Sequence, residues 1–422
     1  MILRYLSAKV IIFIDKTIFY LHYLFKNYFF RNFVAKLLVY DKTKNRQNTM
    51  RKYFALLMIL CCIFPDAMHA QKLAVKSLEV SAMDISASQH ERKSDDGTSC
   101  ALLKVLMTDD IEVADDNVVG SIENHGTEKW MYLKPCTTQL TITAVGRAPL
   151  TIRFATYGIE KLTARSTYEL TLVEDDRRTE TFNVNGVSFC MVQVDGGTFK
   201  MGYIKPHPAN NPDYKGDSGH RVMLSTYMIG ETEVTQELWQ AVMGKNPSRF
   251  KGAGHPVEKV SWNDCQKFIS KLNALTGREF RLPTEAEWEF AARGGNKSRG
   301  TLFSGSDNVD LVAWHHDNAK ITTHPVAQKM PNEIGLYDMS GNVCEWCHDW
   351  YDFYPETPKR DPQGPDKPNS DFKVRMIRGG SAYSCWTNGV DCYVHQRFAH
   401  YEHSVPSCRS ESIGVRLAMS VK

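Results

Sequence analysis

The sequence predicts an α+β protein in which an N-terminal all-β sandwich is followed by a mixed domain with little regular secondary structure. Short runs that alternate apolar and polar residues fill the stretch from about residue 71 to residue 173, which is typical of half-buried strands. Two capped helical segments come later in the chain. The rest of the second half is rich in Gly, Pro, Asn and aromatic residues and lacks the periodicity of further long helices.

Composition excludes one class of partner. The 422 residues are enough for roughly two or three domains with a substantial hydrophobic core. A formal net charge of +3 gives no strongly basic surface, so we expect no nucleic-acid partner.

Residues 1–49 do not resemble a folded domain, and we interpret them as a mis-assigned N-terminal extension. A second start at Met50 precedes a basic pair, an apolar run and the segment PDAMHAQ, which is the order of a secretory signal peptide. We therefore expect residues 50–70 to be removed and the mature protein to be periplasmic, exposed at the cell surface or secreted. Membrane association without a spanning helix is compatible with this prediction. A lipoprotein acylated at Cys61 or Cys62, or a membrane anchor in the extension, is the alternative.

The predicted sandwich occupies residues 71–175. Its expected strands are KSLEVSAMDIS, CALLKVLM, KWMYLKP, QLTITAV, PLTIRF and TYELTLV. Nothing in them indicates chemistry, so we interpret the domain as a spacer or docking module, with ligand binding as the alternative. Export would permit a disulfide between Cys100 and Cys136. The charged segment Glu174–Glu180 is the expected linker.

The second predicted domain, residues 185–422, contains both helical segments. Ser261 and Asp264 have the spacing of a capping box, and Gly277 marks the end of the first helix. Its predicted buried face comprises Cys265, Phe268, Ile269 and Leu272.

The second helix has the same kind of start signal, Thr284 followed by Glu287. Trp288 and the alanine pair Ala291-Ala292 are expected to pack inward, and two glycines end the helix.

The stretch GLYDMSGNVCEWCHDWY carries two candidate sites. Asp338 and Glu345 flank a Gly-Asn turn whose backbone carbonyls can point at the same centre, as in sites for Ca²⁺, although acidic turns are often merely solvated. The segment Cys344–His348 has the CxxCH spacing of covalent haem attachment.

Several motifs occur in the order and spacing of one family, which the chain resembles over about residues 187–421. They are MVQVDGGTFKMG, ETEVTQELW, HPVEKVSWNDC, RLPTEAEWEFAARGG, HPVAQKMPNEIGLYDMSGNVCEWCHDWY, RGGS and IGVRLAM. They resemble the formylglycine-generating enzyme family, also called sulfatase-modifying factors. The resemblance implies a compact fold related to C-type lectins and stabilised by calcium. It also implies that Asp338 and Glu345 supply side-chain oxygens and that Gly341 and Val343 supply backbone oxygens.

The same resemblance changes how the cysteines are interpreted. Cys344 stands where the family usually has a large aromatic residue, whereas Cys347 and His348 belong to an ordinary version of the loop. A loop folded around an ion does not suit an exposed haem attachment site, so haem is not the expected cofactor. A Cys344–Cys347 disulfide or redox pair and two buried thiols remain open.

Oxidases of this family are implied to bind Cu(I) through two cysteines that follow a Gly-Gly-Ser motif, since Cu(I) prefers thiolates. The corresponding residues here are Ser381, Cys385 and Cys392, but the cysteines lie four and eleven residues after the serine, which departs from the family spacing. In addition, Ala291-Ala292 and Leu417 occupy regions where the oxidases have disulfide cysteines. The spacing is compatible with a working copper pair and with a non-catalytic relative.

Histidine clusters offer a further candidate metal site for Zn²⁺ or copper, although ordinary surface histidines are the competing interpretation. These residues are His315, His316, His395, His400 and His403. A set of arginines is expected to brace loop carboxylates and carbonyls rather than bind phosphate. This set comprises Arg375, Arg378, Arg397, Arg409 and Arg416.

Two functions follow. The first is an exported, calcium-stabilised module that binds a protein or glycan or serves surface assembly. The second is a copper-dependent oxidase that converts a cysteine of a sulfatase-type peptide to formylglycine through Cys385 and Cys392, with Ser381 assisting.

Overall fold

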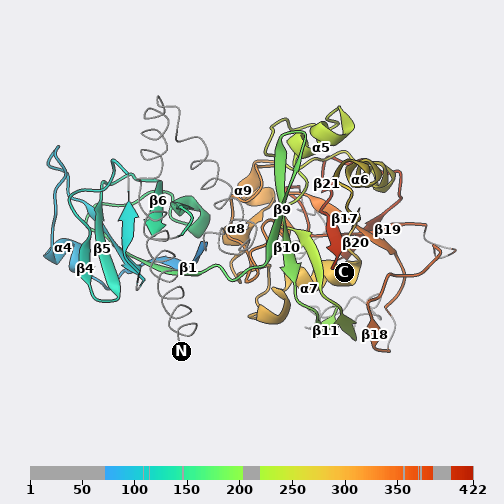
Figure 1. Cartoon of the computed structure of the whole chain (residues 1–422), viewed down its shortest axis with the longest axis horizontal. Coiled ribbons are helices and arrows are strands. Elements are labelled where there is room, and N and C mark those ends of the chain that lie inside the picture. The colour runs from blue at the N-terminus through green and yellow to red at the C-terminus, as the bar shows by residue number, and fades with distance from the viewer. Residues whose placement is uncertain are drawn as a thin grey trace, which may run out of the picture. The chain divides into compact units, whose positions relative to one another are not determined.

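The computed structural model describes residues 72–421 except 108, 114, 145–146, 203–218, 355–356, 369, 371–372 and 384–400, with the backbone alone at 401–402. The described chain divides into two compact units (Figure 1). Unit 1 extends to Arg153 and includes Lys161–Asp175, and unit 2 comprises Phe154–Glu160 and the residues from Asp176 onward. The predicted extension and signal peptide lie outside the described residues. Within the described residues, no helix combines the length and apolar character needed to cross a bilayer.

The described part of unit 1 consists of strands and one short helix. Its elements are β1 (Leu73–Val80), α4 (Ser86–Gln89), β2 (Ala101–Leu106), β3 (Ile111–Val113), β4 (Glu123–His125), β5 (Glu128–Leu133), β6 (Gln139–Ala144), β7 (Leu150–Arg153) and β8 (Thr167–Glu174). They form a five-stranded sheet in the order β1-β8-β2-β5-β4 and a three-stranded sheet in the order β3-β6-β7. Every strand pair is antiparallel except β2 with β8.

The predicted disulfide in unit 1 is wrong. Cys100 is buried in a small cluster with Leu102 and Tyr132, whereas Cys136 is exposed in a turn with a positive φ of 68°. Both thiols are unbonded. One thiol is packed in the core and the other is exposed, so the predicted pair is not formed.

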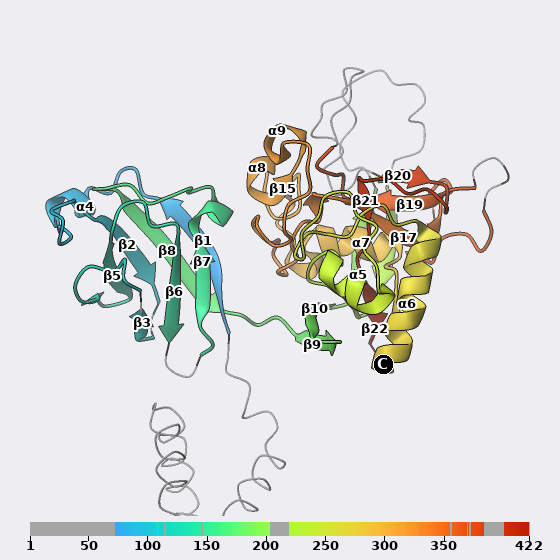
Figure 2. The same cartoon turned by 90° about the horizontal axis from the view of Figure 1, so that it is seen from above.

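Unit 2 contains many short strands and three helices of at least eight residues among the described ones (Figure 2). Its first elements are η2 (Phe154–Tyr157), β9 (Thr179–Val184), β10 (Val187–Val194), β11 (Gly197–Met201), β12 (His220–Leu224), β13 (Tyr227–Gly230), α5 (Gln236–Met243), α6 (Trp262–Thr276), β14 (Phe280–Arg281), α7 (Glu285–Ala292) and η3 (Gly295–Lys297). The remainder are α8 (Val309–Val312), β15 (Ala313–Trp314), α9 (His316–Ala319), β16 (Ser340–Gly341), β17 (Cys344–Trp350), β18 (Lys359–Arg360), β19 (Arg375–Arg378), β20 (Tyr401–Ser404), β21 (Ile413–Gly414) and β22 (Ala418–Ser420).

Unit 2 begins earlier than the sequence predicts. Strand β9 pairs with β10, so residues 179–184 belong to this unit, whereas the sequence placed residues 179 and 180 in the linker and the start of the domain at residue 185. One sheet has the order β14-β22-β13-β10-β9, and another has the order β20-β19-β17-β21. The sheet that contains β17 and β19 carries the candidate site.

Both predicted helices of this unit are confirmed. Ser261 and Asp264 form the capping box of α6, and Gly277 closes that helix with a φ of 67°. The predicted inward residues of α6 are all buried, so the amphipathic pattern correctly predicted the buried face of this helix.

Helix α7 differs from the amphipathic helix that its sequence suggests. Thr284 and Glu287 form the predicted capping box, but all eight residues of α7 are buried, including its three glutamates. The helix lies against β17 and β19 in the interior of unit 2. Buried carboxylates need partners, and they find them in the candidate site.

Candidate functional site

Two candidate loops that are far apart in the sequence lie side by side in unit 2. Gly341 donates its N–H to the carbonyl oxygen of Gly379 at 2.7 Å, and Ala382 donates to the carbonyl oxygen of Asn342 at 2.9 Å. The predicted calcium loop is therefore hydrogen-bonded to the chain both before and after Ser381. Gly341 has a φ of 87°, and a Cβ there would lie 2.3 Å from the Trp314 carbonyl oxygen, so only glycine fits.

Asp338 is buried at the start of this loop. Its Oδ2 accepts a hydrogen bond from the Ala327 N–H at 2.8 Å. Its Oδ1 is buried and has no hydrogen-bond partner among the residues that the structure describes. Burial raises the pKa of Asp338 to about 6. An orphaned buried carboxylate oxygen of this kind suits a cation.

Glu345 is in a different situation. Arg416 donates to both carboxylate oxygens of Glu345 at distances of 2.7 to 3.0 Å. Trp288 adds a hydrogen bond from Nε1 to Oε2 at 2.6 Å. The negative charge of Glu345 is thus balanced inside the protein, and Glu345 does not fit the role of calcium ligand that the resemblance implies.

Glu233 completes this group of carboxyls, and no pattern in the sequence indicated it. Its Oε2 accepts from Asn342 Nδ2 at 2.8 Å, and its Oε1 accepts from the Val343 N–H at 3.1 Å. Burial raises the pKa of Glu233 well above its usual value, and the nearby charges of Asp338 and Glu345 raise it further. Three carboxyls therefore face a single guanidinium, that of Arg416.

The donor set suits a hard cation only in part. Asp338 Oδ1 and the predicted backbone oxygens of Gly341 and Val343 have the right chemistry, whereas Glu345 is occupied by Arg416. Among the described residues, no group of three or more His, Cys, Asp or Glu side chains has an arrangement that could hold a metal ion.

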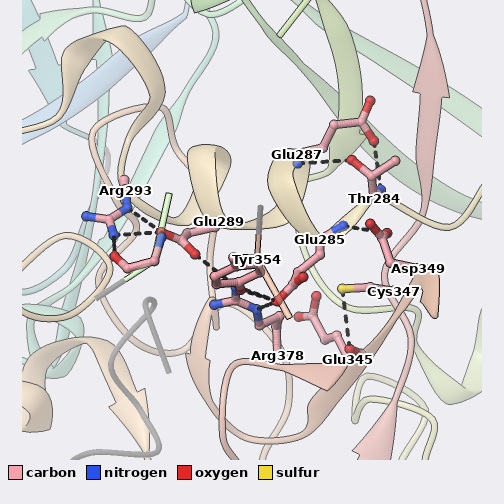
Figure 3. Close-up of polar contacts among 11 residues, drawn as sticks. Thr284, Glu285, Glu287, Glu289, Arg293, Glu345, Cys347, Asp349, Tyr354 and Arg378 are labelled. Carbon is pink, nitrogen blue, oxygen red and sulfur yellow. Dashed lines mark hydrogen bonds and ion pairs between the residues drawn. The ribbon is translucent and has the colours of Figure 1, made fainter. Parts of the chain in front are cut away.

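A second buried network anchors the segment that leads to Ser381 (Figure 3). Arg378 donates through Nη2 to Glu285 Oε1 at 2.7 Å and to Glu289 Oε2 at 2.8 Å. The same nitrogen donates to the hydroxyl of Tyr354 at 2.9 Å. Because Gly379, Gly380 and Ser381 follow Arg378 directly, the α7 glutamates fix the base of the predicted copper loop.

Two further groups complete the network. Arg293 donates to Glu289 Oε1 at 2.6 Å, so Glu289 contacts two guanidinium groups, and their charges lower the pKa of Glu289 against the effect of burial. Asp349 accepts a hydrogen bond from the Glu285 N–H at 2.8 Å. Burial raises the pKa of Asp349 to about 8, and the charge of Glu285 adds to this rise.

Of the three residues predicted for the copper site, the structure describes only Ser381. Ser381 is buried, and its Oγ accepts a hydrogen bond from the Tyr383 N–H at 3.2 Å. Cys385 and Cys392 lie outside the described residues. Ser381 and the calcium loop come together, but the predicted cysteine pair has no described geometry.

Strand β17 separates the two thiols of the CxxCH segment. Cys344 packs in a cluster with Ile413, whereas Cys347 packs in another cluster with Met376. Cys347 forms no disulfide, so the predicted Cys344–Cys347 disulfide is not present. Burial raises the pKa of the Cys347 thiol well above its usual value. Two buried cysteines in a central strand do not form the exposed attachment site that haem requires.

The predicted histidine cluster is not assembled where it can be described. His315 is buried as the N-cap of α9, with Nε2 at 2.9 Å from Asp310 Oδ1, and His316 is half-buried beside Asp317. The ring of His403 lies 4.5 Å from that of Tyr351. His395 and His400 lie outside the described residues.

The predicted bracing role of the arginines is confirmed where they are described. Arg375 donates to the His348 carbonyl oxygen at 2.5 Å. Arg409 donates to Asp264 at 2.7 Å. Arg378 and Arg416 bind the buried carboxylates already described, and Arg397 lies outside the described residues.

Comparison with known proteins agrees with this geometry. The chain is 38% identical to the chaperone protein LppX of Paenibacillus barcinonensis, in a match that covers 41% of this chain and 75% of that protein. It is 35% identical to the formylglycine-generating enzyme of Streptomyces coelicolor, in a match that covers 43% of this chain but only 60% of the enzyme. The chain thus spans less than two thirds of that enzyme's length.

A solved structure shows the same similarity in three dimensions. Treponema denticola variable protein 1 superimposes with a TM-score of 0.50 at 32% sequence identity, covering 58% of this chain and 99% of that protein. Residues 180–421, more than half of the chain, match the sulfatase-modifying factor enzyme 1-like domain. These residues include the loops around Asp338 and Ser381. The chain therefore belongs to the sulfatase-modifying factor family.

Proposed function

We propose that this protein is an exported binding module, in which an N-terminal β-sandwich carries a sulfatase-modifying-factor domain with a C-type-lectin-like fold. Its ligand is a protein or a glycan. The observation that carries the proposal is the rigid base of the Ser381 segment. Before Ser381, Arg378 is held by the buried Glu285 and Glu289 and by the half-buried Tyr354. After Ser381, Ala382 is bonded to Asn342. Such a base supports a binding loop without requiring catalysis.

The altered spacing of Cys385 and Cys392 favours binding over oxidation. The similarity to a protein named as a chaperone supports a polypeptide as the ligand in preference to a glycan. A direct test measures light scattering while reduced, unfolded client protein aggregates with and without the purified mature chain. Suppression of aggregation at stoichiometric amounts is expected. Unchanged scattering, together with binding to immobilised glycans, would assign the ligand to the glycan class.

The second candidate function is the copper-dependent oxidase, which the similarity to a formylglycine-generating enzyme favours. Cys385 and Cys392 would hold Cu(I), which when bound would supply oxygen activation, and Ser381 would assist. The test is mass spectrometry of a Cys-x-Pro-x-Arg peptide incubated with the protein, Cu(I), a thiol reductant and oxygen, with Cys392→Ser as the control. Aldehyde formed by the wild type and absent with the variant would replace the binding proposal with the oxidase.

Calcium is part of the proposal because the buried Oδ1 of Asp338 could bind a cation. We expect calcium to raise the melting temperature of the wild type, because a cation would satisfy the orphaned Oδ1 and offset the buried charge. Asp338→Asn should abolish most of this rise and bring the calcium-free stability up to or above that of the wild type. An equal response to calcium in both proteins would remove Asp338 from any calcium site.

A further inference from the structure

Unit 2 contains a cavity away from Ser381 that none of the preceding functions uses. It has a volume of about 360 Å³ and lies among β10, the segment from Gly230 to Thr235, and the first turn of α5. Part of its wall is apolar and includes the partly exposed side chains of Phe189 and Val326, whereas Met191 and Leu238, which also line it, are almost fully buried. The volume and the apolar wall suit a small organic group rather than a bare ion.

The backbone donors at the start of α5 do not serve a ligand in this cavity. The Gln236 N–H donates to the His255 carbonyl oxygen at 2.8 Å, and the Glu237 N–H donates to the Ala253 carbonyl oxygen at 3.1 Å. The Leu238 N–H donates to the side chain of the N-cap residue, Thr235, at 3.3 Å. With these donors satisfied, the helix terminus offers no site for an anion.

The charged residues that line the cavity favour a cation rather than an anion. The lining residues include three glutamates and no lysine, arginine or histidine. Glu237 is exposed on α5, and Glu231 is partly exposed and accepts from Arg177 at 3.0 Å. Glu233 is buried, with its carboxyl turned to Asn342 and Val343. Because Arg177 balances the charge of Glu231, the exposed negative charge of the lining comes mainly from Glu237.

We propose that this cavity binds an organic cation, namely an ammonium or guanidinium group carried on a short apolar stem. The stem would lie against Phe189 and Val326, and the charged end would meet Glu237. Both a free amine and a lysine or arginine side chain of a polypeptide have this chemistry. The proposal is independent of the binding loop at Ser381.

The test titrates the mature protein, labelled with ¹³C in its methionine methyl groups, and follows the NMR signal of Met191, which is identified by Met191→Leu. The probes are pentylammonium, the neutral 1-pentanol and the anionic pentanoate. Pentylammonium should shift the Met191 signal saturably and bind at least five-fold more tightly than pentanol, and pentanoate should not bind. Glu237→Gln should weaken binding about three-fold or more, and Ser188→Trp should abolish it, because Ser188 lines the cavity and a tryptophan side chain there would occupy part of its volume.

A matched control is Glu169→Gln, an exposed carboxylate of unit 1, which should leave binding unchanged. A peptide with one lysine and its norleucine analogue distinguish the sources of the cation. Binding of the lysine peptide as well as pentylammonium assigns the cavity to a polypeptide side chain, and binding of pentylammonium alone assigns it to a free amine. An unmoved Met191 signal, equal affinity for pentanol and pentylammonium, or full binding in Ser188→Trp would each overturn the proposal.

Discussion

Buried arginines organise the candidate site at the scale of single residues. Arg378 and Arg416 are both almost fully buried, and each balances carboxylates that could not remain ionised alone in the interior. The pairs hold the ends of loops rather than a substrate. These arginines therefore position neighbouring segments, and we expect a ligand to contact those segments rather than the arginines themselves.

Arg378→Met should destabilise unit 2 strongly, because it leaves Glu285 and Glu289 without their main guanidinium partner. A loss of about 3–5 kcal/mol in the free energy of unfolding is expected from breaking a buried pair. Urea unfolding followed by tryptophan fluorescence would measure it. The control is Arg178→Met, which removes an exposed pair with Asp195 and should cost roughly 0–1 kcal/mol. Similar losses in the two variants would contradict the importance assigned to the buried network.

Asp349 makes stability depend on pH. Its pKa of about 8 in the folded protein lies above the ordinary value, so the folded state binds more protons than the unfolded state between about pH 4 and pH 8. The free energy of unfolding should therefore fall as the pH rises through this range. Asp349→Asn mimics the protonated carboxyl and should flatten the dependence. Unfolding curves at four or five pH values would check it, and identical slopes in both proteins would exclude Asp349 as the cause.

At the scale of elements, single backbone hydrogen bonds connect loops in a unit whose strands are mostly short. The link from Gly341 to Gly379 ties the β16–β17 turn to the end of β19, directly before Ser381. The turn depends on its glycine because the left-handed conformation coincides with a close approach to Trp314.

Gly341→Ala should disrupt this link as well as strain the backbone. Gly277→Ala is the matched control, since Gly277 also has a positive φ but has no atom within 4 Å of an added Cβ. The control should cost about 1 kcal/mol and Gly341→Ala clearly more, roughly 2–4 kcal/mol. Urea unfolding compares the two. Ligand binding at the Ser381 segment should weaken only in Gly341→Ala, and equal effects would mean that backbone strain alone accounts for both.

At the scale of the whole molecule, each unit has its own buried core. Leu103 is fully buried in unit 1, and Arg378 belongs to unit 2. Calorimetry of the whole mature chain should therefore resolve two unfolding transitions. Leu103→Ala should lower one of them and Arg378→Met the other. A single transition that both variants shift equally would show that the units unfold as one.

The sequence alone determined the local features that depend on neighbouring residues. The capping boxes at Ser261 and Thr284 and the buried face of α6 follow from side-chain chemistry within a few positions, so they could be predicted. The collinear motifs likewise identified the family, and bracing arginines were expected before their partners were known.

Only the tertiary structure decided which distant groups meet. The pairing of Glu345 with Arg416, the role of Glu233 and the complete burial of α7 depend on segments far apart in the chain. The spacing of neighbouring residues could not predict these contacts, because an acidic residue looks the same in the sequence whether it binds calcium or a guanidinium. The separation of Cys344 from Cys347 is decided in the same way, by a strand that turns the two thiols into different parts of the core.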